Sequence, residues 1–126
     1  MTGFRNATVL IDGKLTKTSV FVNDGKIQGF FEADGQMSLP DGAIVLPGFI
    51  DEHTHGAVGS DTMDANVDAY LTIAKQLVKE GTTAFLLTTM TASVDDINKS
   101  ISAFNEFREN NDDFATPLGI HLEGPF

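Results

Sequence analysis

The sequence predicts an α/β protein in which a β-rich stretch precedes alternating strands and helices. Two observations carry this prediction. The first 45 residues contain four Asp-Gly dipeptides, at 12–13, 24–25, 34–35 and 41–42, and the rest of the chain contains none. From residue 43 onward, apolar runs typical of buried strands alternate with segments whose apolar residues recur at helical spacing. Strands joined by helical crossovers indicate a parallel sheet that helices cover.

The β-rich stretch contains short runs of β-branched and aromatic residues between its Asp-Gly turns. These runs lie at 7–11, 19–22 and 26–31. Asp-Gly favours the positive φ angles of tight hairpin turns. We therefore expect this stretch to form a small antiparallel sheet or half of a sandwich.

The second part of the chain predicts the order β-α-β-α-β, and its first strand is expected over residues 43–55. A helix is expected over 64–80, with Gly81 where a C-terminal cap would lie. Its predicted buried stripe is Val67, Leu71, Ala74 and Val78. Residues 82–90 then predict a second strand that is nearly apolar on both faces.

A second helix is predicted to begin after Ser93, whose hydroxyl can cap it with Asp96 at the third position. Its predicted apolar stripe is Val94, Ile97, Ile101 and Phe104. Pro117 opens a third strand, expected over 118–123. The phenylalanines at 104, 107 and 114 are interpreted as core residues rather than a stacking platform.

Composition narrows the classes of partner. The chain has 126 residues with 8 Lys and Arg against 18 Asp and Glu, which gives a net charge of −10. This charge argues against nucleic acid or an anionic membrane surface as the main partner. The absence of Cys excludes disulfides and thiolate metal sites. With no signal peptide and no apolar run near the ~20 residues of a spanning helix, we expect a cytoplasmic protein.

The first motif that carries chemistry lies in residues 46–56, at the end of the first expected barrel-type strand. His53 and His55 are two residues apart, so on a strand both imidazoles lie on one face and can converge on one cation. Imidazole nitrogen is a favoured ligand of zinc and similar divalent ions. The alternative is a pair of partly exposed histidines without a metal. Asp51 shares their face, and we interpret it as a polar residue rather than a partner of the imidazoles.

The second motif lies in residues 117–126. Glu123 ends the third strand, where a carboxylate is costly to bury unless it is paired or bound to a metal. It lies two strands over from the histidine pair, which is about 10 Å in backbone terms, and the side chains can span this gap. We therefore predict His53, His55 and Glu123 as metal ligands; the alternative for Glu123 is a helix cap or an exposed carboxylate. His121 is interpreted as a hydrogen-bonded interior residue.

Weaker candidates lie in the loops that follow the first two strands. Asp61 and Asp64 could shape the mouth of the site, although helix capping accounts for Asp64. Thr88, Thr89 and Thr91 could contact a ligand, but we interpret them as ordinary strand threonines.

The motif 47–51 followed by His53 and His55 resembles the first-strand signature of the amidohydrolase superfamily. A more specific resemblance, over essentially all 126 residues, is to the N-acetylglucosamine-6-phosphate deacetylases of that superfamily. The segments that carry it are 121–126, 81–83 and 61–64.

The resemblance implies a partial (β/α)8 TIM barrel preceded by part of a small β-sandwich. Residues 1–45 would be the N-terminal part of the sandwich, and residues 46–126 the first three strands and two helices of the barrel. The chain would then be the front part of a longer enzyme. The proton-shuttle Asp, later histidine ligands and the residues that hold the sugar phosphate would lie beyond residue 126, so no catalytic residue is assigned here.

The resemblance also implies a function and a cofactor. The reaction is hydrolysis of the N-acetyl amide of N-acetylglucosamine 6-phosphate to glucosamine 6-phosphate and acetate, in amino-sugar catabolism. Glu123 would bind a divalent metal, and His53 and His55 match the pair that holds a second ion in some members. Zinc is expected, with iron or another divalent ion as alternatives and one or two ions per site. The intact enzyme is expected to be a homodimer, and the fragment to be inactive and to self-associate.

Two other hypotheses remain. One is another metal-dependent amidohydrolase, dihydroorotase-like or deaminase-like. The other is a non-catalytic acidic βαβ domain that binds a partner without a metal.

Overall fold

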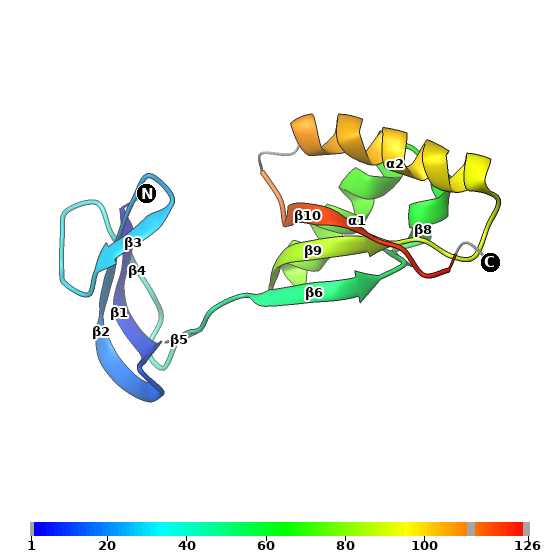
Figure 1. The fold of residues 1–126 in the computed structure, drawn as a ribbon. Helices are drawn as coiled ribbons and strands as arrows, with labels where there is room; N and C mark the ends of the chain where they lie inside the picture. Colours follow the sequence, from blue (N-terminus) through cyan, green and yellow to red (C-terminus); the bar gives the residue numbers. More distant parts are fainter. Residues whose placement is uncertain (1, 111–112, 125–126) are drawn as a thin grey trace. The chain divides into compact units, whose positions relative to one another are not determined.

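The computed structural model describes residues 2–110 and 113–124. The chain divides into two compact units, one that ends at Pro47 and one that begins at Gly48 (Figure 1). The predicted α/β class is confirmed, because the first unit consists of strands and the second combines strands with helices.

The first unit is built around three antiparallel strands, β1 (Gly3–Ile11), β2 (Lys14–Asn23) and β3 (Lys26–Gly29). Asp12-Gly13 and Asp24-Gly25 connect them, and all four residues have positive φ, from 47° to 76°. Positive φ at both central residues defines the type I′ hairpin, whose twist matches that of the flanking strands. The two hairpins predicted from these Asp-Gly pairs are confirmed.

The sheet of the first unit is mixed, so the expectation of an antiparallel sheet was wrong for its later strands. The short strands β4 (Met37–Ser38) and β5 (Ile44–Val45) both pair parallel with β1. In the remaining Asp-Gly pairs only Gly35 and Gly42 have positive φ, 79° and 82°. These turns therefore lack the hairpin geometry, and the chain returns to β1 in the parallel sense. Ala7, Val9 and Val20 form the small core.

The second unit contains a three-stranded parallel sheet in the order β10-β9-β6. Its strands are β6 (Phe49–Thr54), β9 (Thr82–Thr88) and β10 (Thr116–His121). The single strand expected over 43–55 is divided into β5 and β6, which belong to different sheets, because Pro47 has no N–H to donate. The expected burial of this strand was also wrong, since β6 pairs on one side only and Phe49 and Ile50 are 69% and 63% exposed.

Two helices, α1 (Val67–Lys79) and α2 (Val94–Glu109), pack with the sheet around one core (Figure 1). The buried residues that they share with β9 and the start of β10 are Ala69, Tyr70, Ile73, Ala74, Leu77, Phe85, Leu87, Ala103, Phe104, Phe107 and Ala115. Phe104 and Phe107 are thus core residues as predicted, and Phe114 packs against them. Neither helix is long and apolar enough to cross a bilayer.

In each helix, one end residue of the predicted apolar stripe is exposed instead of buried. In α1, Ala74 is buried as predicted and Val67 and Leu71 pack against the core, whereas Val78 is 47% exposed. The buried side also includes Tyr70, Ile73 and Leu77. The helix turns this side inward because Tyr70 meets the Phe107 ring edge-on, with 5.8 Å between centroids. In α2, Ile97 is buried as predicted but Val94 is 66% exposed in the first turn.

Side-chain caps set where both helices begin. The Ser93 hydroxyl accepts a hydrogen bond from the Asp96 N–H at 3.2 Å, which confirms the predicted cap of α2. The predicted capping role of Asp64 is confirmed for the short 3₁₀ helix Thr62–Asp64, whereas the cap of α1 is a different residue. The cap is Asn66, whose side-chain oxygen accepts from the Ala69 N–H at 2.9 Å. Beyond α1, Gly81 has the predicted left-handed conformation, with φ of 85°.

Candidate metal centre

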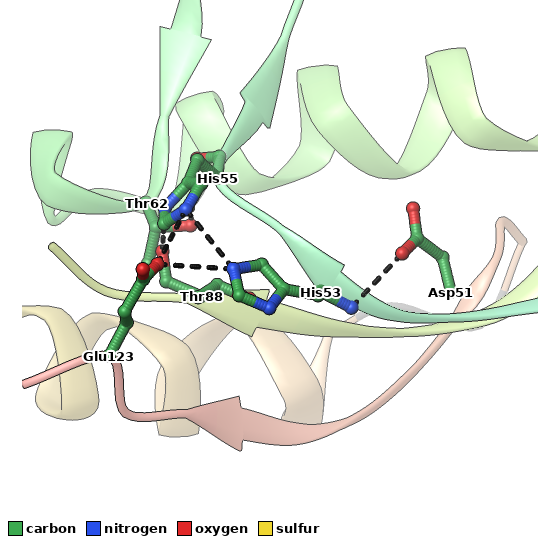
Figure 2. A network of polar contacts seen from close by, with 6 residues as sticks. All are labelled: Asp51, His53, His55, Thr62, Thr88 and Glu123. Carbon is green, nitrogen blue, oxygen red and sulfur yellow. Dashed lines mark hydrogen bonds and ion pairs between the residues drawn. The ribbon is translucent and has the colours of Figure 1, made fainter.

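The three predicted ligands lie where two parallel strands end. His53 belongs to β6, His55 follows the last residue of that strand, and Glu123 follows β10. Because β6 and β10 flank β9 and run in the same direction, their carboxyl ends meet at one edge of the sheet. Figure 2 shows the two imidazoles and the carboxylate pointing toward one another.

The ligand atoms of these side chains lie close together. Glu123 Oε2 is 3.1 Å from His53 Nε2 and 2.9 Å from His55 Nε2, and the two nitrogens are 3.3 Å apart. Among the residues that the structure describes, this is the only group of three or more His, Asp or Glu side chains whose ligand atoms all lie within 4.8 Å of one another. His53 and Glu123 are about half exposed, at 49% and 50% of their side-chain surface, so solutes can reach the group.

A contact with the sheet sets the hydrogen-bonding state of His55. Its Nδ1 lies 3.1 Å from the main-chain oxygen of Thr88, at the end of β9. A carbonyl oxygen only accepts hydrogen bonds, so Nδ1 carries the proton and Nε2 of the neutral ring presents its lone pair. This lone pair faces Glu123 Oε2, which is also an acceptor when ionised. The arrangement therefore requires either a further proton or a cation between the two atoms.

The donor set fits a divalent cation. Imidazole nitrogens and a carboxylate oxygen are typical ligands of zinc, and ligands about 2.0–2.1 Å from a tetrahedral ion lie about 3.3 Å from one another. The observed separations of 2.9 to 3.3 Å are close to this spacing. The three side chains could thus hold one ion with little rearrangement.

The neighbouring acidic residue and the third histidine do not join this group. Asp51 Oδ1 accepts a hydrogen bond from the main-chain N–H of His53 at 3.0 Å, and Figure 2 shows the carboxylate directed away from the imidazoles. The His121 ring lies against the His53 ring, with 4.7 Å between centroids. The expected hydrogen bond of the His121 ring is not formed within residues 2–110 and 113–124. Pro125 and Phe126, which end the second motif, lie outside the described residues.

The weaker candidates occupy structural positions. Asp61 and Asp64 form a capping box around the 3₁₀ helix η1 (Thr62–Asp64): Asp61 Oδ1 accepts from the Met63 N–H and Asp64 Oδ2 from the Asp61 N–H. Thr88 and Thr89 are fully buried, and their hydroxyls have no partner in the described part of the chain. Thr91 is exposed.

Sequence reasoning missed Thr62, which contacts the site from the first turn of η1. Its N–H and its hydroxyl both donate to the main-chain oxygen of His55, at 2.7 and 2.9 Å. The signal that could have revealed it is the capping-box pattern of residues 61–64, which predicts a fixed turn directly after the histidine motif.

Comparison with known proteins gives a consistent picture. The model of the Amidohydrolase family matches residues 44–126. The chain is 39% identical to the N-acetylglucosamine-6-phosphate deacetylase of Lysinibacillus sphaericus, over 97% of this chain and 33% of the relative. It is 33% identical to the enzyme of the same name from Bacillus subtilis, with the same coverage of 97% and 33%.

A solved structure extends the likeness to three dimensions. The N-acetylglucosamine-6-phosphate deacetylase of Thermotoga maritima matches with a TM-score of 0.78 and 28% identity, over 96% of this chain and 31% of that protein. The chain thus spans about a third of the length of the curated relatives that it matches.

Proposed function

This chain belongs to the amidohydrolase family, and we propose that it supplies the first metal ligands of a deacetylase. The proposed reaction is hydrolysis of the N-acetyl amide of N-acetylglucosamine 6-phosphate, which yields glucosamine 6-phosphate and acetate. The observation that carries the proposal is the convergence of His53, His55 and Glu123 in a chain whose relatives are named as deacetylases of this substrate.

The proposed architecture is the beginning of a (β/α)8 barrel. Residues 46–126 would contribute its first three strands and two helices, and residues 1–45 part of a neighbouring β-sandwich. The parallel order β10-β9-β6, with helices as connections, supports this assignment. Barrels of this kind carry their active sites at the carboxyl ends of the strands, which is where the three ligands lie.

We propose a divalent ion, zinc in the first instance, with one or two ions in the complete site. When bound, such an ion lowers the pKa of a coordinated water and polarises the acetyl carbonyl. The residues of this chain would hold and orient the ion. The Thr88 carbonyl keeps the proton of His55 on Nδ1 so that Nε2 is free to bind, and the Glu123 carboxylate supplies negative charge.

The residues for the remaining steps of the proposed reaction are assigned to parts of the enzyme outside this chain. An Asp that carries the proton to the leaving amine, and the groups that bind the sugar phosphate, are proposed to lie beyond residue 126. The net charge of −10 supports this division, because this chain by itself would repel an anionic substrate. A cytoplasmic role in amino-sugar breakdown and a homodimeric enzyme are part of the same proposal.

The alternatives are less well supported. A dihydroorotase-like or deaminase-like reaction has no counterpart among the named relatives described above. A non-catalytic acidic binding domain leaves the meeting of three ligand atoms without a role.

Calorimetric titration of the purified chain with Zn²⁺ tests the site. We expect His53→Ala and Glu123→Gln to weaken binding by well over tenfold, since losing even a group behind a metal ligand costs about 10–100-fold. Glu52→Gln is the matched control, because Glu52 is an exposed carboxylate of the same strand outside the ligand group. Equal Zn²⁺ affinity of Glu123→Gln and the unmodified chain would contradict the proposal.

The reaction itself is tested in a chimera in which this chain replaces the matching third of the Bacillus subtilis relative. We expect the chimera to release acetate from N-acetylglucosamine 6-phosphate and its Glu123→Gln version to lose that activity. A folded, metal-loaded chimera without turnover, beside an active relative, would count against the assignment of the substrate.

A further inference from the structure

We propose that Thr62 is a positioning residue of the metal centre: it clamps the main chain of His55 so that the imidazole is held in its ligating position. This inference rests on the proposed function in one respect, which is that His55 binds a metal. It adds a residue that lies outside the ligand set and acts through the ligand.

His55 needs such a clamp because its main chain lies outside the paired residues of β6 and β9. The residue lies one position beyond the last residue of β6, Thr54. The register between β6 and β9 is irregular between Asp51 and Thr54, and Thr54, paired with Leu87, is the last residue of β6 in the ladder. The main-chain oxygen of His55 instead accepts two hydrogen bonds from Thr62, from the N–H at 2.7 Å and from the hydroxyl at 2.9 Å.

Thr62 is itself fixed to the core. It is fully buried, and its main-chain oxygen accepts a hydrogen bond of 2.7 Å from the hydroxyl of Tyr70. Tyr70 is also fully buried and packs on the ring of Phe107. A continuous path of short contacts therefore leads from the centre of the core through Thr62 to the ligand.

The clamp acts together with a second contact on the imidazole. The Thr88 carbonyl holds Nδ1, while Thr62 holds the main chain of the same residue. With one restraint on the main chain and one on the ring, Nε2 is directed toward Glu123 Oε2, at 2.9 Å. Restraints of this kind behind metal ligands are typically worth 10–100-fold in affinity. We expect the lower end of this range for the Thr62 hydroxyl, because its N–H would remain.

The competing explanation is that the Thr62 hydroxyl only satisfies a buried carbonyl. In that case its loss would lower stability without a specific effect on the metal. The two roles are separated by comparing the metal affinity of a Thr62 variant with that of a variant elsewhere in the core that loses a similar amount of stability.

The experiment titrates Co²⁺ into the purified 126-residue chain and follows its visible absorption bands, with the melting temperature measured in parallel. Thr62→Val removes the hydroxyl at nearly constant shape, and Thr62→Ser retains it. Ile97→Val is the stability control, because it trims a buried residue of α2 outside the site. We expect Co²⁺ affinity to fall about tenfold in Thr62→Val, and to stay within about threefold in Thr62→Ser and Ile97→Val.

The outcomes separate this inference from the proposed function. If Glu123→Gln loses Co²⁺ binding while Thr62→Val keeps it, the metal site stands and the clamp is overturned. If Glu123→Gln binds Co²⁺ as tightly as the unmodified chain, the metal site itself fails and the clamp fails with it. Should Thr62→Val not fold, Tyr70→Phe decides, since it removes the hydroxyl that contacts the main-chain oxygens of Thr62, at 2.7 Å, and of Ser100, at 3.3 Å. An affinity loss clearly larger than that of the Ile97→Val control supports the clamp, and an affinity equal to that of the control overturns it.

Discussion

At the scale of single residues, the site depends on how one histidine is restrained. The His55 ring donates to a carbonyl of the neighbouring strand, and its own carbonyl accepts from Thr62. His53 has no comparable restraint on its ring, whose contacts within the described residues are with the other two ligands and His121. The two histidines therefore play unequal parts, although they are neighbours in a symmetric-looking His-x-His motif.

A residue-scale prediction concerns the ionisation of Tyr70. Burial raises the pKa of Tyr70 above its ordinary value of 10.0; the hydrogen bond with Ser100 opposes this shift, and the charges of Asp64 and Asp61 add to it. A folded-state pKa above the unfolded value means that the neutral phenol stabilises the fold fully below pH 10. This contribution is then lost as pH rises through the raised pKa.

Tyr70 is the one tyrosine of a chain without Trp, so tyrosinate absorbance measures this group alone. We expect the absorbance to rise later than for free tyrosine, together with a loss of folded structure by circular dichroism. Tyr70→Phe should abolish the part of the stability change that begins near pH 10. A normal titration of Tyr70 in a chain that stays folded would be inconsistent with its burial.

At the scale of elements, the turn after the histidines forms a tight hairpin of β7 (Gly56–Ala57) and β8 (Ser60–Asp61). Val58 and Gly59 connect these strands with φ angles of 54° and 80°. The hairpin brings the chain back to Thr62 within a few residues of His55. The hairpin thus places Thr62 where its N–H and hydroxyl can donate to the main-chain oxygen of His55.

We predict that Gly56→Ala disrupts this hairpin. A Cβ at Gly56 would collide with the main-chain oxygen of Ser60 and lie 2.9 Å from the Asp61 Cα, and main chain cannot move aside as a side chain can. The expected loss is about 1–3 kcal/mol in the free energy of unfolding, measured by urea denaturation.

Gly119→Ala is the matched control for this prediction. Its added Cβ would meet only a side-chain methyl of Leu86, at 3.4 Å. We expect it to cost clearly less than Gly56→Ala. Equal losses in the two variants would show that space at Gly56 is not limiting.

At the scale of the whole molecule, apolar side chains remain exposed on the strands of the second unit. Phe49 and Ile50 lie on β6 and Leu118, which is 52% exposed, lies on β10; Leu122, which is 54% exposed, follows directly after β10. Large exposed apolar side chains that gather into a patch are typical of association sites. A net charge of −10 opposes association only at long range and is screened by salt.

We therefore predict that the chain self-associates in a way that salt promotes. Sedimentation velocity at increasing protein concentration should show a rising mean mass, more so at high salt. Ile50→Lys together with Leu118→Lys should shift the distribution toward monomer, because each places a charge on an exposed apolar position. A sharp monomer peak for the unmodified chain at all concentrations would contradict this prediction.

Features that depend on neighbouring residues could be predicted from the sequence. The Asp12-Gly13 turn, the Ser93 cap and the alternation of His53 and His55 each follow from chemistry within a few positions. The prediction of an α/β class followed from the same local patterns. The start of α1 was harder to predict, because two capping residues lie two positions apart: Asp64 belongs to the capping box of η1 and Asn66 caps α1.

Only the tertiary structure decided which distant groups meet. Glu123 reaches His53 across 70 positions of the chain, and the Thr88 carbonyl and Thr62 reach His55 from two other elements. The parallel pairing of β4 and β5 with β1 belongs to the same class. Local propensities do not encode these contacts, because they arise from how the strands are ordered and how the core packs. The sequence alone thus determined the types of the proposed ligands and the spacing of the two histidines, and packing determined that the three side chains meet at one place.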